Sequence, residues 1–268
     1  MTTLAPSLNV PTPGLVRAEI LKLRKRRGLV ATVSFLTVGA AILTYGILAI
    51  LHAANAAHHG PAGGVTNLGH GVFVLSALGA VAAALVGAAA GAGDLSAGVF
   101  RELVVTGRPR RTLFRSRVPG GLAFLLTFVA VAYGVAAVAS VVFAGSLAAP
   151  STSLLISTGL WLLLSCAFYF ALALGIASVL GSRSTTIGIL LAFRLAVTPI
   201  LLSIGALGVG REIVPGAALG RIAPEAVRQF TTAGDRIPMS VSASTWVLVA
   251  WAVVALAFGA WRTVTRDA

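Results

Sequence analysis

Charged residues are scarce in this sequence. Only 10% of its 268 residues are Asp, Glu, Lys or Arg, and 57% are hydrophobic, whereas a soluble domain has about 25% charged residues. The charges that occur are concentrated in short segments, so uncharged runs of 20 residues or more lie between them. Runs of that length span a bilayer as helices. The composition therefore excludes an ordinary soluble domain and predicts an all-α integral membrane protein.

Cysteine and lysine are almost absent. Cys166 is the only cysteine, which excludes an intrachain disulfide. The only lysines, Lys22 and Lys25, follow no glycine-rich loop, so no residue is a candidate for a P-loop lysine. A nucleophile elbow and a metalloprotease motif are also missing. We therefore expect that the chain is not an enzyme and that it binds no cofactor or metal itself.

The net charge of +13 is carried by basic residues that flank the apolar runs, which indicates membrane orientation rather than binding to nucleic acid. Placing the N-terminus in the cytoplasm assigns 15 Lys and Arg residues to the cytoplasmic side and four to the outer side. The positive-inside rule then predicts that both termini are cytoplasmic. The abundance of Arg, Ala, Gly and Val suggests a bacterial protein, and hence a multi-pass protein of the bacterial cytoplasmic (inner) membrane.

The apolar runs predict a single domain, 1–268, with six spans. Residues 1–28 form a cytoplasmic tail and a surface helix. A stripe of small residues in the second span, which includes Gly79, Gly87 and Gly91, predicts close packing of helices. The loop after the first span contains all four histidines, His52, His58, His59 and His70, in a spacing that defines no metal site. The spans are expected at about 29–51, 71–92, 118–143, 154–180, 186–209 and 245–261.

An amphipathic helix is predicted before the first span, over 15–27, with a cap at Thr12-Pro13-Gly14. Its apolar positions Val16, Ile20 and Leu23 recur at helical spacing, and cations occupy the other face. Such a helix lies at the membrane surface, where anionic lipid head groups attract its cations.

A second amphipathic helix is predicted in the charged segment 94–111, between the second and third spans. Asp94 is expected to cap a helix that opens at Leu95. Leu95, Val99 and Leu103 then share one face, with Phe100 beside them. Gly107 and Pro109 end the helix. This segment suits docking onto a partner in the aqueous phase.

These residues resemble a known pattern, that of the permease subunits of type-2 ATP-binding-cassette (ABC) exporters. Members show an acid, a glycine, a basic-apolar helix, a turn and a lysine that begins the next span. Arg117 stands here where the family usually has lysine, and Asp94 where it often has glutamate. An acid-x-x-lysine-leucine start, Glu19 to Leu23, fits as well, and the six spans extend the resemblance over nearly the whole chain. The pattern is formed by Asp94, Gly98, Arg101, Glu102, Leu103, Thr106, Pro109, Arg110 and Arg117.

The resemblance implies a fold with an N-terminal interfacial helix, a cytoplasmic coupling helix between spans two and three, and short extracytoplasmic helices over 211–236. It implies a separate ABC ATPase, in two copies or a related pair, that binds ATP and Mg, and a second permease subunit, identical or related. The interfacial helix and the turn at 181–185 would also rest on the ATPase. The implied coupling residues are Asp94, Leu95, Gly98, Val99, Phe100, Arg101, Glu102, Leu103, Arg108, Pro109 and Arg110. Those of the interfacial helix are Arg17, Glu19, Ile20, Lys22 and Leu23.

The implied function is ATP-driven export of a drug, a peptide antibiotic or a lipid-like amphiphile, which is consistent with multidrug or antibiotic export. Arg194 is the only charge within a span. It would contact an anionic substrate or the second permease, or extend to the lipid head groups. Pro199 is expected to kink that span. An ATP-independent secondary carrier is the alternative, although such carriers usually place several ionisable groups at mid-membrane. A membrane enzyme is a third interpretation, which the lack of embedded acids and histidines disfavours.

Overall fold

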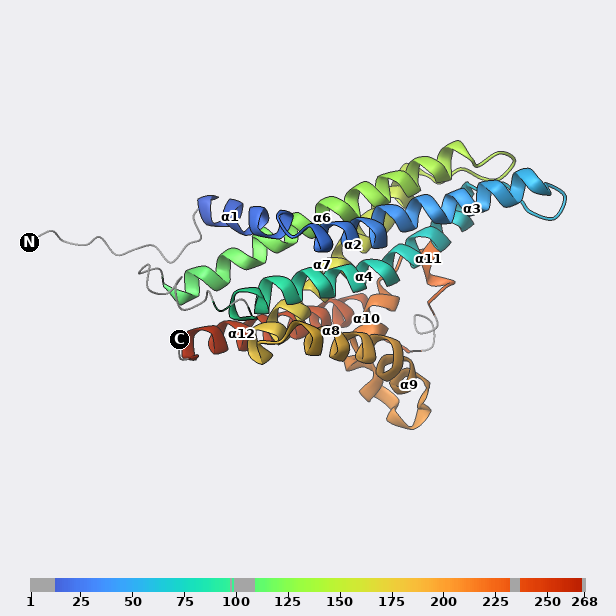
Figure 1. The fold of residues 1–268 in the computed structure, drawn as a ribbon. Helices are drawn as coiled ribbons and strands as arrows, with labels where there is room; N and C mark the ends of the chain where they lie inside the picture. The colour runs from blue at the N-terminus through green and yellow to red at the C-terminus, as the bar shows by residue number, and fades with distance from the viewer. Residues whose placement is uncertain (1–12, 97, 99–108, 232–236, 267–268) are drawn as a thin grey trace, which may run out of the picture.

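The computed structural model describes residues 13–96, 98, 109–231 and 237–266 (Figure 1). These residues form helices and no strands. Six helical segments are long and apolar enough to cross a membrane, which confirms the prediction of an all-α, multi-pass membrane protein. They are Arg27–Ala54, Gly64–Leu95, Arg110–Val142, Thr152–Leu180, Arg183–Ser203 and Val241–Thr265.

The first and fifth of these segments are not continuous α-helices. The first consists of α2 (Arg27–Ser34), a π-helical turn η1 (Phe35–Gly39) and α3 (Ala40–Ala54). The fifth consists of α8 (Arg183–Ala192), a π-helical turn η2 (Phe193–Val197) and α9 (Thr198–Ser203). Pro199 is the second residue of α9 and has no backbone N–H to donate. The π-helical turn η2 ends two residues before Pro199, the residue at which the sequence predicts a kink.

The other spanning helices are α4 (Gly64–Ser96), α6 (Arg110–Val142), α7 (Thr152–Leu180) and α12 (Val241–Thr265). α4 and α6 begin seven and eight residues earlier than expected, and α12 begins four residues earlier. α4 begins in the predicted histidine loop, because its first two turns pack against the later segment α11 (Glu225–Arg228), where Gly69 lies against the carbonyl of Ala226. α6 begins at Arg110, so its first two turns carry the arginines that precede the third apolar run.

The central pair of the bundle is α4 and α7, whose side chains are the most buried of the six segments. Small residues let the two backbones approach. A Cβ atom added to Gly87 would lie 2.5 Å from the Cβ of Ala173, and one added to Gly91 would lie 2.7 Å from the carbonyl oxygen of Leu174. The predicted role of the small-residue stripe in helix packing is thus confirmed.

The other face of α7 packs against α12 through a second pair of small residues. A Cβ atom added to Gly259 would lie 2.9 Å from the Cα of Gly175. By contrast, the fifth segment and α12 expose many large apolar side chains, including Leu195, Ile200 and Trp246. In a membrane protein such exposed apolar faces are in contact with lipid or with another membrane-embedded chain.

Short helices fill the connection between the fifth segment and α12. They are the 3-10 helix η3 (Gly205–Ile213), α10 (Pro215–Arg221) and α11. The fifth span ends at Ser203, earlier than the expected residue 209, and the chain continues into η3. α10 is mostly buried, and the indole N–H of Trp161 on α7 donates to the carbonyl of Leu219 at 3.0 Å. Of the short helices expected over 211–236, α10 and α11 are present and pack against the bundle, whereas residues 232–236 lie outside the described part of the chain.

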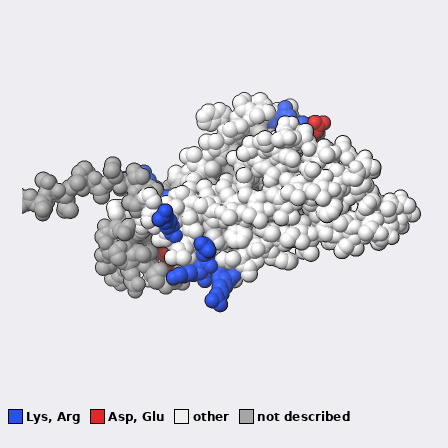
Figure 2. All heavy atoms as spheres, turned by 90° about the horizontal axis from the view of Figure 1, so that it is seen from above, with Lys and Arg blue, Asp and Glu red and all other residues white. Residues whose placement is uncertain are grey.

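The two ends of the bundle differ in charge. The start of α1 (Pro13–Arg24) and the end of α12 lie at the same end (Figure 1). On the face drawn in Figure 2, one basic group lies beside an acidic side chain at the upper edge, whereas most Lys and Arg side chains gather at the end where α1 starts and α12 finishes. We call it the basic end. It is formed by α1, the last turn of α4, the first turns of α6, the start of α8 and the end of α12.

We predict that Gly87→Ala destabilises the bundle by about 1–3 kcal/mol, because the added Cβ overpacks the contact between α4 and α7. Gly134→Ala is the matched control, since a Cβ at Gly134 meets no atom within 4 Å. It is expected to be neutral or to stabilise the helix by up to about 1 kcal/mol. Unfolding of the purified protein in detergent measures both, and equal stability of the two variants would contradict this account of the packing.

Candidate functional site

Asp94 lies in the last turn of α4 and does not begin a new helix. α4 continues through Leu95 to Ser96, and Gly98 follows it with a φ of +71°, the left-handed conformation typical of a residue just past a helix end. The expectation that Asp94 caps a helix opening at Leu95 is therefore wrong. It rested on local sequence rules, whereas the carboxylate is neutralised by cations from two other helices.

A buried charge cluster surrounds this carboxylate. Arg117 of α6 donates from Nη2 to Asp94 Oδ2 at 2.8 Å, and Lys22 of α1 places its Nζ 3.0 and 3.1 Å from the two carboxylate oxygens. Glu19 Oε2 also lies 2.6 Å from Lys22 Nζ. Asp94 and Arg117 are only 3% and 1% exposed. A carboxylate is unfavourable at the negative end of a helix dipole, so these cations stabilise its charge there.

The cluster joins three segments that are far apart in sequence. Asp94 belongs to α4, Arg117 to α6, and Lys22 to α1, 72 residues before Asp94. The approach of α1 to α6 depends on Gly120, where a Cβ atom would lie 2.7 Å from the Cβ of Glu19. Because a buried charge that loses its partner is costly, the cluster fixes the position of α1 against both helices.

Arginines at the basic end also bind the carbonyl groups of neighbouring helix ends. Arg183 of α8 donates to Gly93 O at 3.1 Å, and Arg266 donates to Val179 O near the end of α7 at 2.9 Å. Arg110 donates to Val264 O near the end of α12 at 3.1 Å. The last carbonyls of a helix have no partner within the helix, and cations there complement its dipole. These contacts connect α4, α6, α7, α8 and α12 at one end. Burial, followed by the neighbouring cation of Arg262, lowers the pKa of Arg266 from its usual value.

The residues implied in coupling to a partner fall into two groups. Asp94, Leu95, Gly98, Pro109 and Arg110 are described, and they form the end of α4 and the start of α6. Arg110 binds the carbonyl of Val264 on α12, a contact that sequence reasoning missed because Val264 follows 154 residues later. The remaining residues lie outside the described part of the chain. They are Val99, Phe100, Arg101, Glu102, Leu103 and Arg108.

The residues of the expected interfacial helix lie on two faces of α1. Leu23 is fully buried and Ile20 is half-buried, while Arg17 is exposed. Glu19 and Lys22 belong to the charge cluster, which sequence reasoning did not connect with Asp94. The spacing of three residues between Glu19 and Lys22 could have indicated that these two side chains pair, because residues three apart are neighbours on one helix face.

Arg194 points into the bundle from the π-helical turn η2. Its Nη2 donates to Ser76 O on α4 at 3.3 Å, and its guanidinium carbon lies 4.6 Å from the ring centre of Tyr169 on α7, a cation–π contact. It borders a cavity of about 100 Å³. Among the described residues no acid forms an ion pair with it. The cavity is lined mainly by Phe73, Ser76, Trp161, Ser165, Tyr169 and Thr231.

The histidines make local contacts. His52 Nδ1 lies 2.7 Å from His59 O, His58 Nδ1 lies 3.2 Å from Asn55 Oδ1, and the ring of His70 stacks on Phe230. Across residues 13–96, 98, 109–231 and 237–266, no group of three or more His, Cys, Asp or Glu side chains is arranged to hold a metal ion.

Comparison with known proteins finds no protein-family model and no curated protein that matches this chain. The resemblance to ABC permeases therefore depends on the order of its motifs along six spans.

We predict that Asp94→Asn destabilises the protein by about 3–5 kcal/mol, because Arg117 remains buried without its counter-charge. Arg117→Lys keeps the positive charge, so we expect it to lower the free energy of unfolding much less. Glu225→Gln is the matched control, since Glu225 is an exposed acid at the opposite end. Chemical unfolding in detergent micelles measures all three. A stability of Asp94→Asn equal to that of Glu225→Gln would show that the cluster does not hold these helices together.

Proposed function

We propose that this protein is the transmembrane subunit of an ATP-driven ABC exporter and acts as a dimer with a second permease. One observation carries the proposal: the charge cluster ties α1 to the last turn of α4 and to the third turn of α6, the two helices that flank the segment 97–108. A force applied to that segment, or to α1, would act on Asp94 and Arg117 together. The segment has the residue pattern of the coupling helix in ABC permeases.

The rest of the basic end suits the same role. The arginine contacts between helix ends would distribute a push on the coupling segment to α7, α8 and α12. Residues 181–185, which form the two-residue connection Gly181-Ser182 and the start of α8, would provide a second contact with the ATPase. Small-residue packing of α4 on α7 would then carry the displacement along the bundle as a movement of whole helices.

The proposed orientation places the basic end in the cytoplasm. The excess of Lys and Arg at that end is the pattern that the positive-inside rule associates with the cytoplasmic side. Both termini are then cytoplasmic, in the cell membrane, and the helices η3, α10 and α11 belong to the outer half. ATP and Mg would be bound by the ATPase, and this chain would supply the pathway and no catalysis.

The proposed cargo is an amphipathic molecule, such as a drug, a peptide antibiotic or a lipid-like compound. The apolar side chains exposed on the fifth segment and α12 favour an apolar body. Arg194 favours an anionic or strongly hydrogen-bonding group on that cargo, because its cation lies within a span without an acidic partner among the described residues. One ionisable side chain within the spans disfavours the alternative of a secondary carrier, because ion coupling usually uses several such groups.

Leu103→Asp tests the coupling segment. The protein should be co-reconstituted in proteoliposomes with the proposed ABC ATPase partner, and both ATP hydrolysis and export measured. We expect Leu103→Asp to abolish export while the permease stays folded, because a charge would enter the apolar face that contacts the ATPase. Leu103→Met is the control and should retain both activities. Wild-type transport by Leu103→Asp, or export without any ATPase, would overturn the proposal.

Arg194→Gln tests the cargo contact. It removes the cation but keeps hydrogen-bonding groups, so the protein is expected to fold. Export of anionic amphiphiles should fall by about tenfold or more, whereas export of uncharged amphiphiles should change little. Arg194→Lys should retain part of the anionic transport. Equal loss for both classes of cargo would argue that Arg194 serves only the packing of α4, α7 and η2.

A further inference from the structure

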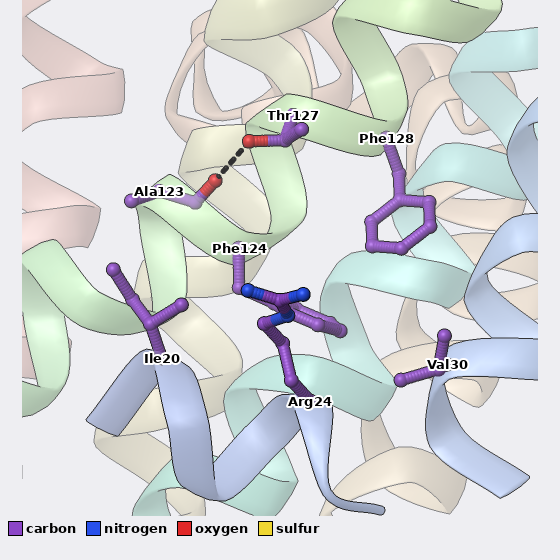
Figure 3. Close-up of a pocket in the computed structure, with 7 residues that line it drawn as sticks. All are labelled: Ile20, Arg24, Val30, Ala123, Phe124, Thr127 and Phe128. Atoms are coloured by element: carbon purple, nitrogen blue, oxygen red, sulfur yellow. Dashed lines mark hydrogen bonds between the residues drawn. The ribbon is translucent and has the colours of Figure 1, made fainter. Parts of the chain in front are cut away.

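A groove of about 550 Å³ lies between the N-terminal segment and α6 (Figure 3). Its floor is Phe124, which is 4% exposed, and Phe128 lies beside it with a ring separation of 5.2 Å. Ile20 of α1 and Val30 of α2 form the facing wall. The remaining residues that line it are Arg24, Ala123 and Thr127.

The groove lies beside a close contact between α1 and α6. At Gly120, α1 and α6 are in close contact through Glu19. After Arg24 the chain turns through Lys25 and Arg26 into α2, and the groove lies between this part of the chain and residues 123–128 of α6. The Thr127 hydroxyl donates to Ala123 O at 2.7 Å, within α6. The only polar side chain on the α6 wall therefore already has a partner.

Arg24 is the charged group of this groove. Figure 3 shows its guanidinium extending over the groove beside Phe124, with Ile20 and Val30 on either side. In the part of the chain that the structure describes, Arg24 forms no hydrogen bond or ion pair. Lys22, two residues earlier, is by contrast bound to Asp94 and Glu19. The sequence thus places one cation of α1 in the charge cluster and leaves a second one at an apolar surface.

The position of the groove matches the boundary between charged and apolar parts of the membrane. Phe124 and Phe128 follow the buried Arg117 by seven and 11 residues, which is about 10 and 16 Å along the helix. The groove therefore runs from the level of the basic end toward the apolar middle of the bundle. A molecule that fills it needs an anionic group at one end and an apolar chain at the other.

We propose that the groove binds one anionic phospholipid from the leaflet at the basic end. Its phosphate pairs with Arg24, and one acyl chain lies on Phe124 and Phe128 against Val30. The lipid fills the space between α1 and α6 and so holds α1 in place beside the charge cluster. The site is formed by this chain alone and does not depend on an ATPase partner.

The experiment uses the full-length protein, delipidated in detergent and then supplied with phosphatidylglycerol or with phosphatidylcholine of the same chains. Native mass spectrometry counts the lipids retained, and thermal unfolding measures their effect on stability. For the wild type we expect one tightly retained lipid, a preference of about fivefold for phosphatidylglycerol, and a higher melting temperature with it. Glycerol phosphate, which lacks acyl chains, should have no effect.

Two variants with matched controls separate the charge from the groove. Arg24→Gln should abolish the preference for phosphatidylglycerol, and Arg17→Gln should preserve it, because Arg17 is an exposed cation of α1 that does not line the groove. Ala123→Trp fills the groove and should abolish retention of the lipid. Ala130→Trp places the same side chain at another exposed position of α6, and we expect it to leave retention of the lipid unchanged.

Three results would overturn the proposal. If Arg17→Gln reduces the preference as much as Arg24→Gln does, the attraction is a general one between α1 and anionic lipid. If Ala123→Trp retains the lipid, the lipid is bound elsewhere. If glycerol phosphate stabilises the protein as the lipid does, Arg24 binds a free phosphate group and the apolar groove has no part in it.

Discussion

The structure depends on the neutralisation of one buried carboxylate. Asp94 stands at the end of α4, where the helix dipole disfavours a negative charge, and burial would make that charge more costly still. Arg117 and Lys22 remove this cost only if α6 and α1 both lie against α4. The position of a surface helix and the entry of the third span are thereby coupled. The segment that joins α4 to α6 follows Ser96, which lies two residues after Asp94, and ends two helical turns before Arg117.

Packing and charge have separate roles in this bundle. Along its length, glycines at the α4–α7 and α7–α12 contacts bring backbones together without polar groups, as lipid-embedded helices require. At the basic end, arginines bind the carbonyl groups that helix termini leave without partners. The middle of the bundle is therefore held together by close packing, and the basic end is held together by hydrogen bonds. Mechanical coupling between the two needs only that the helices move as rigid units.

The sequence predicted the spanning helices well because hydropathy is a local property that the bilayer requires of every span. It also predicted the packing role of Gly87 and Gly91, since small residues at helical spacing have few other uses in lipid. It failed at Asp94, where a local capping rule was outweighed by Lys22, a residue 72 positions away. The early start of α4 was missed for a similar reason, because α11, which packs there, follows much later in the chain. The sequence also could not predict where the Arg194 side chain points, because this depends on its contacts with Ser76 and Tyr169 on other helices.

The π-helical turn η2 has a consequence for the faces of the fifth segment. A π-helical turn contains one residue more than an α-helical turn. The residues that follow it are therefore shifted by one position, or about 100° around the axis, from the α-helical pattern of the residues before it. α8 and α9 consequently present different sequence registers to the same neighbours, and the extra residue lies where Arg194 leaves the helix. Loss of a single residue from this turn would convert it to a regular α-helical turn and leave the side chains of α8 and α9 facing the same neighbours. Related chains one residue shorter here would therefore keep the packing of both helices and lose only the widened turn that carries Arg194.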